Sequence, residues 1–169
     1  MPDATELELI AQEVRARHGD DVVVGTTYYR EQATLEVKPE AVRDVIAGLR
    51  ERYPLLMSVH GCDYLPEEPR FGVHYQLLNM RNPDRLCVKT RVGLENCEVP
   101  SIVGIHPGAN HQEREVYDMF GVVFKGHPDL RRILMPEDYE GHPQRRDFPM
   151  GGEPVLFTHN EHQMPRWYD

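Results

Sequence analysis

The feature that most restricts the fold of this chain is a run of prolines toward its C-terminus. They stand at Pro128, Pro136, Pro143, Pro149, Pro154 and Pro165. Proline lacks a backbone N–H and clashes inside a helix, so this region can form neither a long helix nor a central strand. Apolar side chains nevertheless persist from Leu130 to Trp167, unlike in a solvated linker. We therefore predict an extended, partner-binding arm over 125–169, with a tail packed on its own domain as the alternative.

Residues 1–93 show regular hydrophobic periods instead. A capping box from Thr5 to Glu8, followed by apolar residues at helical spacing, predicts a first helix. Helical spacing after Pro39, which suits a first helical turn, predicts a second. Alternation typical of strands marks Gln32–Val37, Phe71–Leu77 and Arg85–Val92, and apolar runs mark two further strands at Asp21–Tyr29 and Leu55–Cys62. This order predicts an α+β two-layer sandwich, in which a mixed, mainly antiparallel sheet of about five strands has helices on one face.

Residues 94–124 are predicted to hold a linker and a short helix. Asn110 is expected to cap that helix, with Glu113 completing a capping box. Arg114 and Asp118 are one helical turn apart, which favours an ion pair between them. No nucleophile or metal motif accompanies these carboxylates, so we expect a capped or interface helix and no general acid–base pair.

Composition and charge exclude several classes of protein. A formal net charge of −9 argues against a general nucleic-acid surface, which needs clustered basic residues. No apolar run approaches the roughly 20 residues that span a bilayer. No glycine-rich phosphate motif occurs, so the chain is not expected to bind a dinucleotide. Cys62, Cys87 and Cys97 are too few for an iron–sulfur cluster, which usually takes four thiolates.

The histidines leave one catalytic alternative open. His159 and His162 flank Glu161, but they form no standard zinc motif, so a metal-dependent hydrolase is only an alternative. His127 and His142 each stand in a Gly-His-Pro unit. There we expect the imidazole to hydrogen-bond a backbone group or a carboxylate while the proline fixes the chain.

Two pairs of adjacent arginines could bind phosphate. Arg131–Arg132 and Arg145–Arg146 are, however, interspersed with aspartates and glutamates, so no positive field results. Pairing with carboxylates across a protein interface fits this pattern better.

The stretches 113–122 and 126–149 combine charged residues, glycines and prolines in a specific order. In that order they resemble the family of the 30 kDa-type subunit of proton-pumping NADH–quinone oxidoreductase, respiratory complex I. The chain departs from the family pattern at His111–Gln112 and at Tyr139, where tryptophan is expected. The positions that carry the resemblance are Glu113, Arg114, Glu115, Tyr117, Asp118, Phe120, Gly121, His127, Pro128, Leu130, Arg131, Arg132, Pro136, His142, Pro143, Arg145, Arg146 and Asp147.

The resemblance implies a non-catalytic scaffold subunit in the peripheral arm, on the cytoplasmic side of the cell membrane. Its partners would be the quinone-site subunit and the iron–sulfur subunits. NADH, FMN, Fe-S clusters and quinone would be bound by those partners, and no cofactor by this chain. The matching residues would be interface residues, with Arg131 and Arg132 needed for assembly and not for folding. The equivalent subunit of a membrane-bound nickel–iron hydrogenase-type relative is the alternative.

Overall fold

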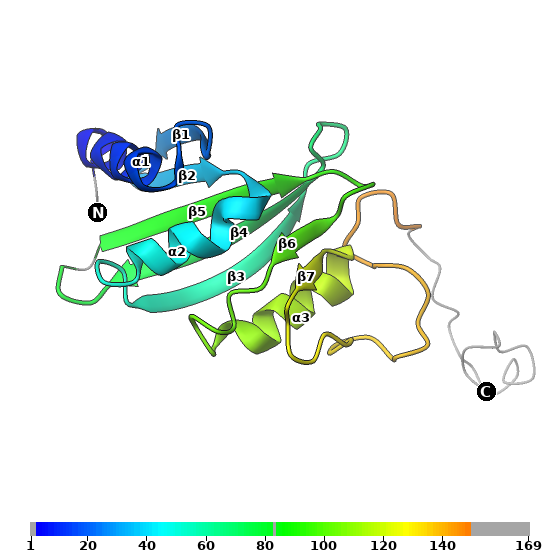
Figure 1. The fold of residues 1–169 in the computed structure, drawn as a ribbon. Helices are drawn as coiled ribbons and strands as arrows, with labels where there is room; N and C mark the ends of the chain where they lie inside the picture. The colour runs from blue at the N-terminus through cyan, green and yellow to red at the C-terminus, as the bar shows by residue number, and fades with distance from the viewer. Residues whose placement is uncertain (1–2, 83, 150–169) are drawn as a thin grey trace, which may run out of the picture.

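A computed structural model describes residues 3–82 and 84–149 (Figure 1). Its elements in chain order are α1 (Ala4–His18), β1 (Val23–Tyr29), β2 (Gln32–Val37), the 3-10 turn η1 (Pro39–Ala41), α2 (Val42–Leu49), β3 (Leu55–Asp63), β4 (Phe71–Asn79), β5 (Asp84–Val92), β6 (Glu98–Pro100), α3 (Ala109–Phe120) and β7 (Val123–Lys125).

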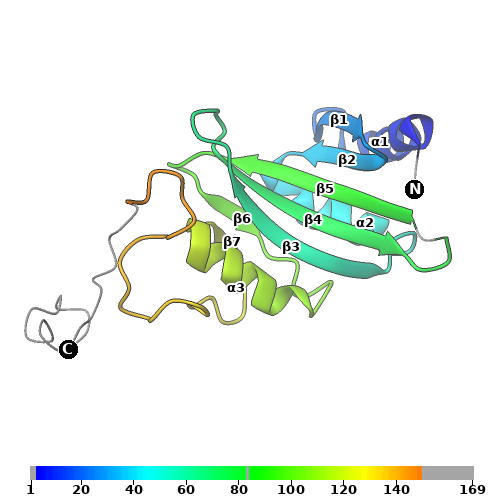
Figure 2. The ribbon, with the colours of Figure 1, turned by 180° about the vertical axis from the view of Figure 1, so that it is seen from behind.

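The main sheet has five strands in the order β1-β2-β5-β4-β3. Neighbouring strands are antiparallel except β2 and β5, which run parallel, with Leu35 opposite Val88. Helices α1 and α2 cover one face, and Figure 2 shows the opposite face of the central strands in front of them. The predicted α+β sandwich with a mixed, mainly antiparallel sheet is therefore confirmed.

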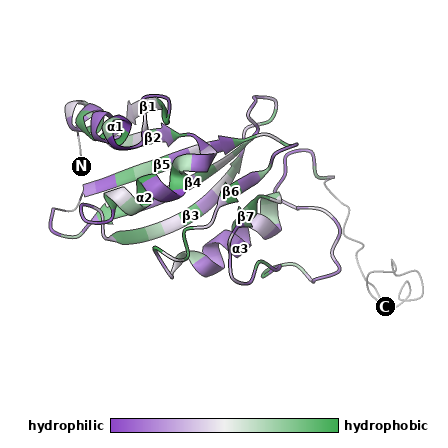
Figure 3. Cartoon of the chain, in the orientation of Figure 1, coloured by the Kyte–Doolittle hydropathy of each residue, from purple (hydrophilic) through white to green (hydrophobic). Residues whose placement is uncertain are grey.

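Alternation along the strands builds the core between the sheet and the two helices. On β4 the side chains of Phe71, Val73, Tyr75 and Leu77 are buried, whereas His74 and Gln76 on the other face are half-buried. Helix α2 buries one apolar face against this layer. Burial of one such side chain contributes about 1.5–3 kcal/mol, so this layer supplies most of the driving force for folding. In Figure 3 hydrophilic residues predominate in the segment after β7.

Both predicted helix caps are wrong. Helix α1 begins at Ala4, and its N-cap is Asp3, whose Oδ1 accepts the Glu6 N–H at 2.8 Å. Asp and Thr are both good N-caps, so sequence alone did not separate them. Helix α3 begins at Ala109, one residue before the expected cap Asn110, and its N-cap Gly108 makes no side-chain cap.

Helix α3 lies along the edge strand β3. The Gln112 Oε1 accepts the backbone N–H of Val59 at 2.5 Å, so the helix occupies part of the free edge of the sheet. Gly61 faces the Phe120 ring so closely that a Cβ at that position would overlap it. After α3, strand β7 pairs in parallel with β6 to form a small second sheet, and the chain continues from there.

Residues 126–149, here called the strap, lie on the chain's own domain (Figures 1 and 2, yellow to orange). Backbone and side-chain hydrogen bonds connect the strap to α3 and to the end of β3. The described half of the predicted arm therefore packs on its own domain, and its binding to a partner stays a prediction. The other half, 150–169, lies outside the described residues, as do His159 and His162. The predicted divisions at residues 93 and 124 stay predictions.

Candidate functional site

Asp118 of α3 is the centre of the contact between helix and strap. Its side chain is 0% exposed. Its Oδ2 accepts three consecutive backbone N–H groups, from Ile133 at 3.0 Å, Leu134 at 2.7 Å and Met135 at 2.9 Å. Successive amides that converge on one oxygen form an anion-binding concavity, and here the anion is a side chain of the same protein.

Two arginines complete this contact. The Arg132 Nη1 donates to Asp118 Oδ1 at 2.7 Å, and its Nη2 donates to the carbonyls of Tyr139 and Gly141 at 2.7 and 2.9 Å. Arg114, one turn before Asp118 on α3, donates to the carbonyls of Arg131 and Arg132 at 3.1 and 3.0 Å. We call Arg114, Asp118 and Arg132 the clamp. It holds the strap backbone from the carbonyl of residue 131 to the amide of residue 135.

The clamp corrects one expectation. Asp118 pairs with Arg132 and not with Arg114, because the strap approaches α3 closely enough to supply its own guanidinium. The Arg132 side chain is bound within the chain, and its role in assembly stays a prediction. The Arg131 side chain is 59% exposed and pairs with nearby Asp129 at 3.0 Å.

Hydrogen bonding sets the charge state of Asp118. Burial acts to raise the pKa of this carboxyl, but the hydrogen bonds from Met135, Arg132, Leu134 and Ile133 outweigh it and lower the pKa below the usual aspartate value. The clamp therefore contains a carboxylate at neutral pH, as pairing with a guanidinium requires.

A second contact fixes the far end of the strap. Arg70, whose side chain is 4% exposed, lies between Asp63 and Asp147 with Nη2–oxygen distances of 2.7 Å to each. The backbone N–H of Arg146 also donates to Asp63 at 2.8 Å. Hydrogen bonds from Arg70 hold the pKa of Asp63 well below its usual range, against the opposing effect of burial. The strap is thus held to the end of β3 as well as to α3.

Gly121 and the two Gly-His-Pro histidines shape the turn between helix and strap. Gly121 has φ +78°, and a Cβ there would overlap the Arg145 and His142 side chains. His142 Nδ1 lies 2.9 Å from the carbonyl of Asp118, and His127 Nε2 lies 3.1 Å from that of Asn110. The predicted backbone hydrogen bonds of both imidazoles are confirmed. Burial lowers the pKa of His142, which favours its neutral form.

Glu113 points away from the strap into the protein. It is 0% exposed and accepts the Ser101 hydroxyl at 2.6 Å and the Ile102 N–H at 2.8 Å. Burial raises its pKa to about 7, against the lowering effect of these two hydrogen bonds. The predicted capping box is absent because this carboxyl braces α3 against the segment after β6.

Comparison with known proteins assigns the chain to a family. A family model described as the 30 Kd subunit of respiratory-chain NADH dehydrogenase matches residues 35–154, which include the whole clamp. The chain belongs to this family. A NADH-quinone oxidoreductase subunit from Roseiflexus sp. (strain RS-1) is 48% identical over 145 residues, covering 83% of both chains.

Two solved structures share the fold of this family member. One is the trypsin-resistant fragment (1-134) of Nqo5, with TM-score 0.62 and 30% identity over 73% of this chain and 98% of the other. The second is a chain of a membrane-bound sulfane sulfur reductase, described as an archaeal respiratory membrane complex. It has TM-score 0.69 and 28% identity over 85% of each chain.

The structure brings only some of the predicted site residues together. Those gathered between α3 and the strap are Arg114, Tyr117, Asp118, Phe120, Gly121, Arg132, His142 and Arg145. Glu115, Pro128, Arg131 and Pro136 are exposed. Sequence reasoning missed Asp63 and Arg70, which lie outside both motif stretches and carry no local pattern that marks them. The interface role of these residues stays a prediction.

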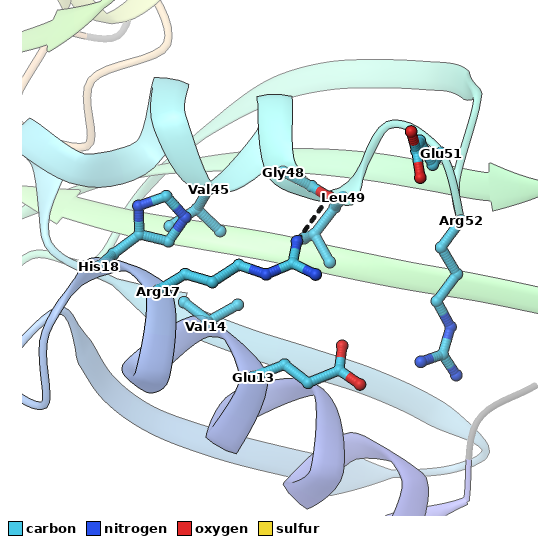
Figure 4. A pocket seen from close by; sticks show the side chains of 9 residues that line it. All are labelled: Glu13, Val14, Arg17, His18, Val45, Gly48, Leu49, Glu51 and Arg52. Atoms are coloured by element: carbon cyan, nitrogen blue, oxygen red, sulfur yellow. Dashed lines mark hydrogen bonds between the residues drawn. The ribbon is translucent and has the colours of Figure 1, made fainter.

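A groove between α1 and α2 is lined by charges of both signs, among them Glu13, Arg17 and Arg52 (Figure 4). Arg17 already donates to the Gly48 carbonyl at 3.5 Å across it. Within 3–82 and 84–149, no three His, Cys, Asp or Glu side chains gather as metal ligands. The same residues include no helix that is long and apolar enough to cross a membrane.

Proposed function

We propose that this chain is a non-catalytic scaffold subunit of proton-translocating NADH–quinone oxidoreductase, complex I. The observation that carries the proposal is that the family match contains the whole clamp, whose charged groups all bind other groups of the same chain. A catalytic acid, base or nucleophile needs a reactive atom that faces a substrate. The charges of the clamp instead hold a surface segment in a fixed shape, which is a scaffold's task.

The proposal extends to place and partners. The quinone-site subunit and the iron–sulfur subunits of the peripheral arm would contact this chain on the cytoplasmic side of the membrane. A second candidate is the equivalent subunit of a different respiratory complex of the hydrogenase type. The likeness to a chain of the sulfane sulfur reductase keeps this candidate open, because the fold also occurs in a respiratory membrane complex of another name. The higher identity to the NADH-quinone oxidoreductase relative favours the first candidate.

Recovery of the assembled complex tests the proposal. The full chain, tagged at its N-terminus, replaces the host's own copy, and membranes are solubilised in mild detergent. We expect affinity purification to recover the other subunits of NADH–quinone oxidoreductase with NADH:quinone reductase activity. Recovery of hydrogenase-type subunits would select the second candidate. Recovery of the chain alone from membranes that contain intact complex would overturn both.

We also propose that the chain binds no cofactor of its own. Burial raises the pKa of Cys87 and of Cys97 to about 11, so both are protonated thiols at neutral pH and poor metal ligands. The purified chain should be colourless, with iron, zinc and flavin far below one equivalent by elemental analysis and absorbance. Stoichiometric metal or flavin that survives dialysis would contradict this.

A further inference from the structure

The strap exposes two large apolar side chains next to each other. Leu134 is 60% exposed and Ile133 is 38% exposed. On either side of them, Leu130 and Met135 are half-buried and pack against the hydrophobic core. The strap therefore points inward at residues 130 and 135 and presents its two large exposed apolar side chains between them.

The backbone below this pair is fixed by the clamp. The N–H groups of Ile133 and Leu134 both donate to the buried carboxylate of Asp118, and the carbonyl of Arg132 accepts from Arg114. Loops that expose apolar residues are usually mobile, whereas this one is held by hydrogen bonds that do not use the exposed side chains. The hydrogen bonds that fix the strap on α3 use backbone groups, so they do not depend on Ile133 or Leu134 being apolar.

We propose that Ile133 and Leu134 form a preformed anchor that inserts into an apolar socket on another subunit of the complex. This inference rests on the proposed function and names the part of the surface that binds. Interface energy concentrates in a few well-packed side chains, and an anchor already fixed in its bound shape loses little conformational freedom on binding.

The charges around the anchor specify the rim of the socket. Arg131 is neutralised by Asp129 at 3.0 Å. Glu137, Asp138 and Glu140 are exposed on the same strap, and no ion pair of theirs is found among the described residues. Arg114 beside the anchor also has no carboxylate partner among the described residues, but the three carboxylates outnumber this one guanidinium. The net unpaired charge beside the anchor is therefore negative, as is the chain as a whole, at −9. The matching partner surface is an apolar socket rimmed by arginine or lysine.

The first test is Leu134→Ser in the tagged full chain, in competition with untagged wild type during assembly. The expected result is about tenfold or greater loss of incorporation, because an anchor side chain is removed. The matched control is Met80→Ser, since Met80 is 66% exposed in the turn between β4 and β5. Both variants should keep the wild-type thermal midpoint, because neither side chain belongs to the core. Equal incorporation of Leu134→Ser and Met80→Ser would overturn the anchor.

A second pair of variants tests the rim. The double variant Glu137→Lys with Asp138→Lys should be incorporated less well than wild type, and its incorporation should depend on salt concentration. The control Glu95→Lys, at another exposed position, should be incorporated like wild type. A photoreactive amino acid at position 134 should crosslink to an apolar segment with arginine or lysine nearby on a different subunit. Crosslinking to a second copy of this chain, or to an acidic segment, would contradict the proposal. If the wild-type chain recovers no complex subunits, the proposed function is wrong. If wild type and Leu134→Ser assemble equally well, only the anchor proposal is wrong.

Discussion

Replacing Asp118 with alanine is expected to lower the free energy of unfolding by about 3–5 kcal/mol, the usual effect of removing one partner of a buried ion pair. The substitution leaves the guanidinium of Arg132, whose side chain is 13% exposed, without its carboxylate. It also leaves three strap N–H groups without an acceptor. Each unsatisfied buried group carries its own desolvation cost. Thermal unfolding should shift down by about 10 °C for a chain of this length.

Two further variants make this result specific to the clamp. Arg131→Ala should change stability by about 0–1 kcal/mol, because the ion pair of this exposed arginine with Asp129 lies at the surface. Combining Asp118→Ala with Arg132→Ala should give less than the sum of the single effects, because the two groups depend on each other. If Asp118→Ala is no worse than Arg131→Ala, the clamp does not hold the strap in solution.

The clamp also predicts behaviour in acid. The folded-state pKa of Asp118 lies below its unfolded value, so its contribution is complete above the unfolded pKa and is lost as the pH falls through the folded one. Asp63 and Asp147 also have lowered pKa values and act in the same direction. Wild type should therefore lose more stability than Asp118→Ala when the pH is lowered below about 4.

Glu113 should give the opposite dependence, at higher pH. Its folded pKa is about 7, above the ordinary 4.5, so the folded state binds a proton that the unfolded state has already lost between these values. The free energy of unfolding then falls as the pH rises through this window, by up to about 3 kcal/mol. Urea unfolding at pH 5 and pH 8 should show wild type to be the less stable at pH 8.

Glu113→Gln should remove this loss. The amide oxygen can still accept the Ile102 N–H, and the amide nitrogen can donate to the Ser101 hydroxyl, so the brace of α3 is kept without a buried charge. We expect Glu113→Gln to exceed wild type in stability at pH 8 and to approach it at pH 5. Glu115→Gln, at an exposed neighbouring position, is the control and should follow wild type. If the free energy of unfolding of Glu113→Gln still depends on pH as in wild type, another residue is the titrating group.

The sequence predicted best where burial repeats regularly. Strand β4 and helix α2 were expected close to their observed bounds, because each buries one face with a fixed period. The strap was predicted less well: its prolines correctly excluded regular structure, but its attachment to α3 was not foreseen. That attachment is made by the side chains of Arg114 and Asp118. Such long-range side-chain contacts, like that of Arg70 with Asp147, leave no periodic trace in one sequence.

The parallel pairing of β2 with β5 has a consequence for the order in which the chain folds. Strands β3, β4 and β5 are consecutive antiparallel neighbours and can pair as soon as each is made. Strand β2 must wait, because its partner β5 follows two further strands and a helix along the chain. Closing so long a loop is entropically costly, and distant pairings slow folding. The N-terminal hairpin therefore docks late, and a ribosome-bound chain cannot complete its sheet until residue 92 has emerged.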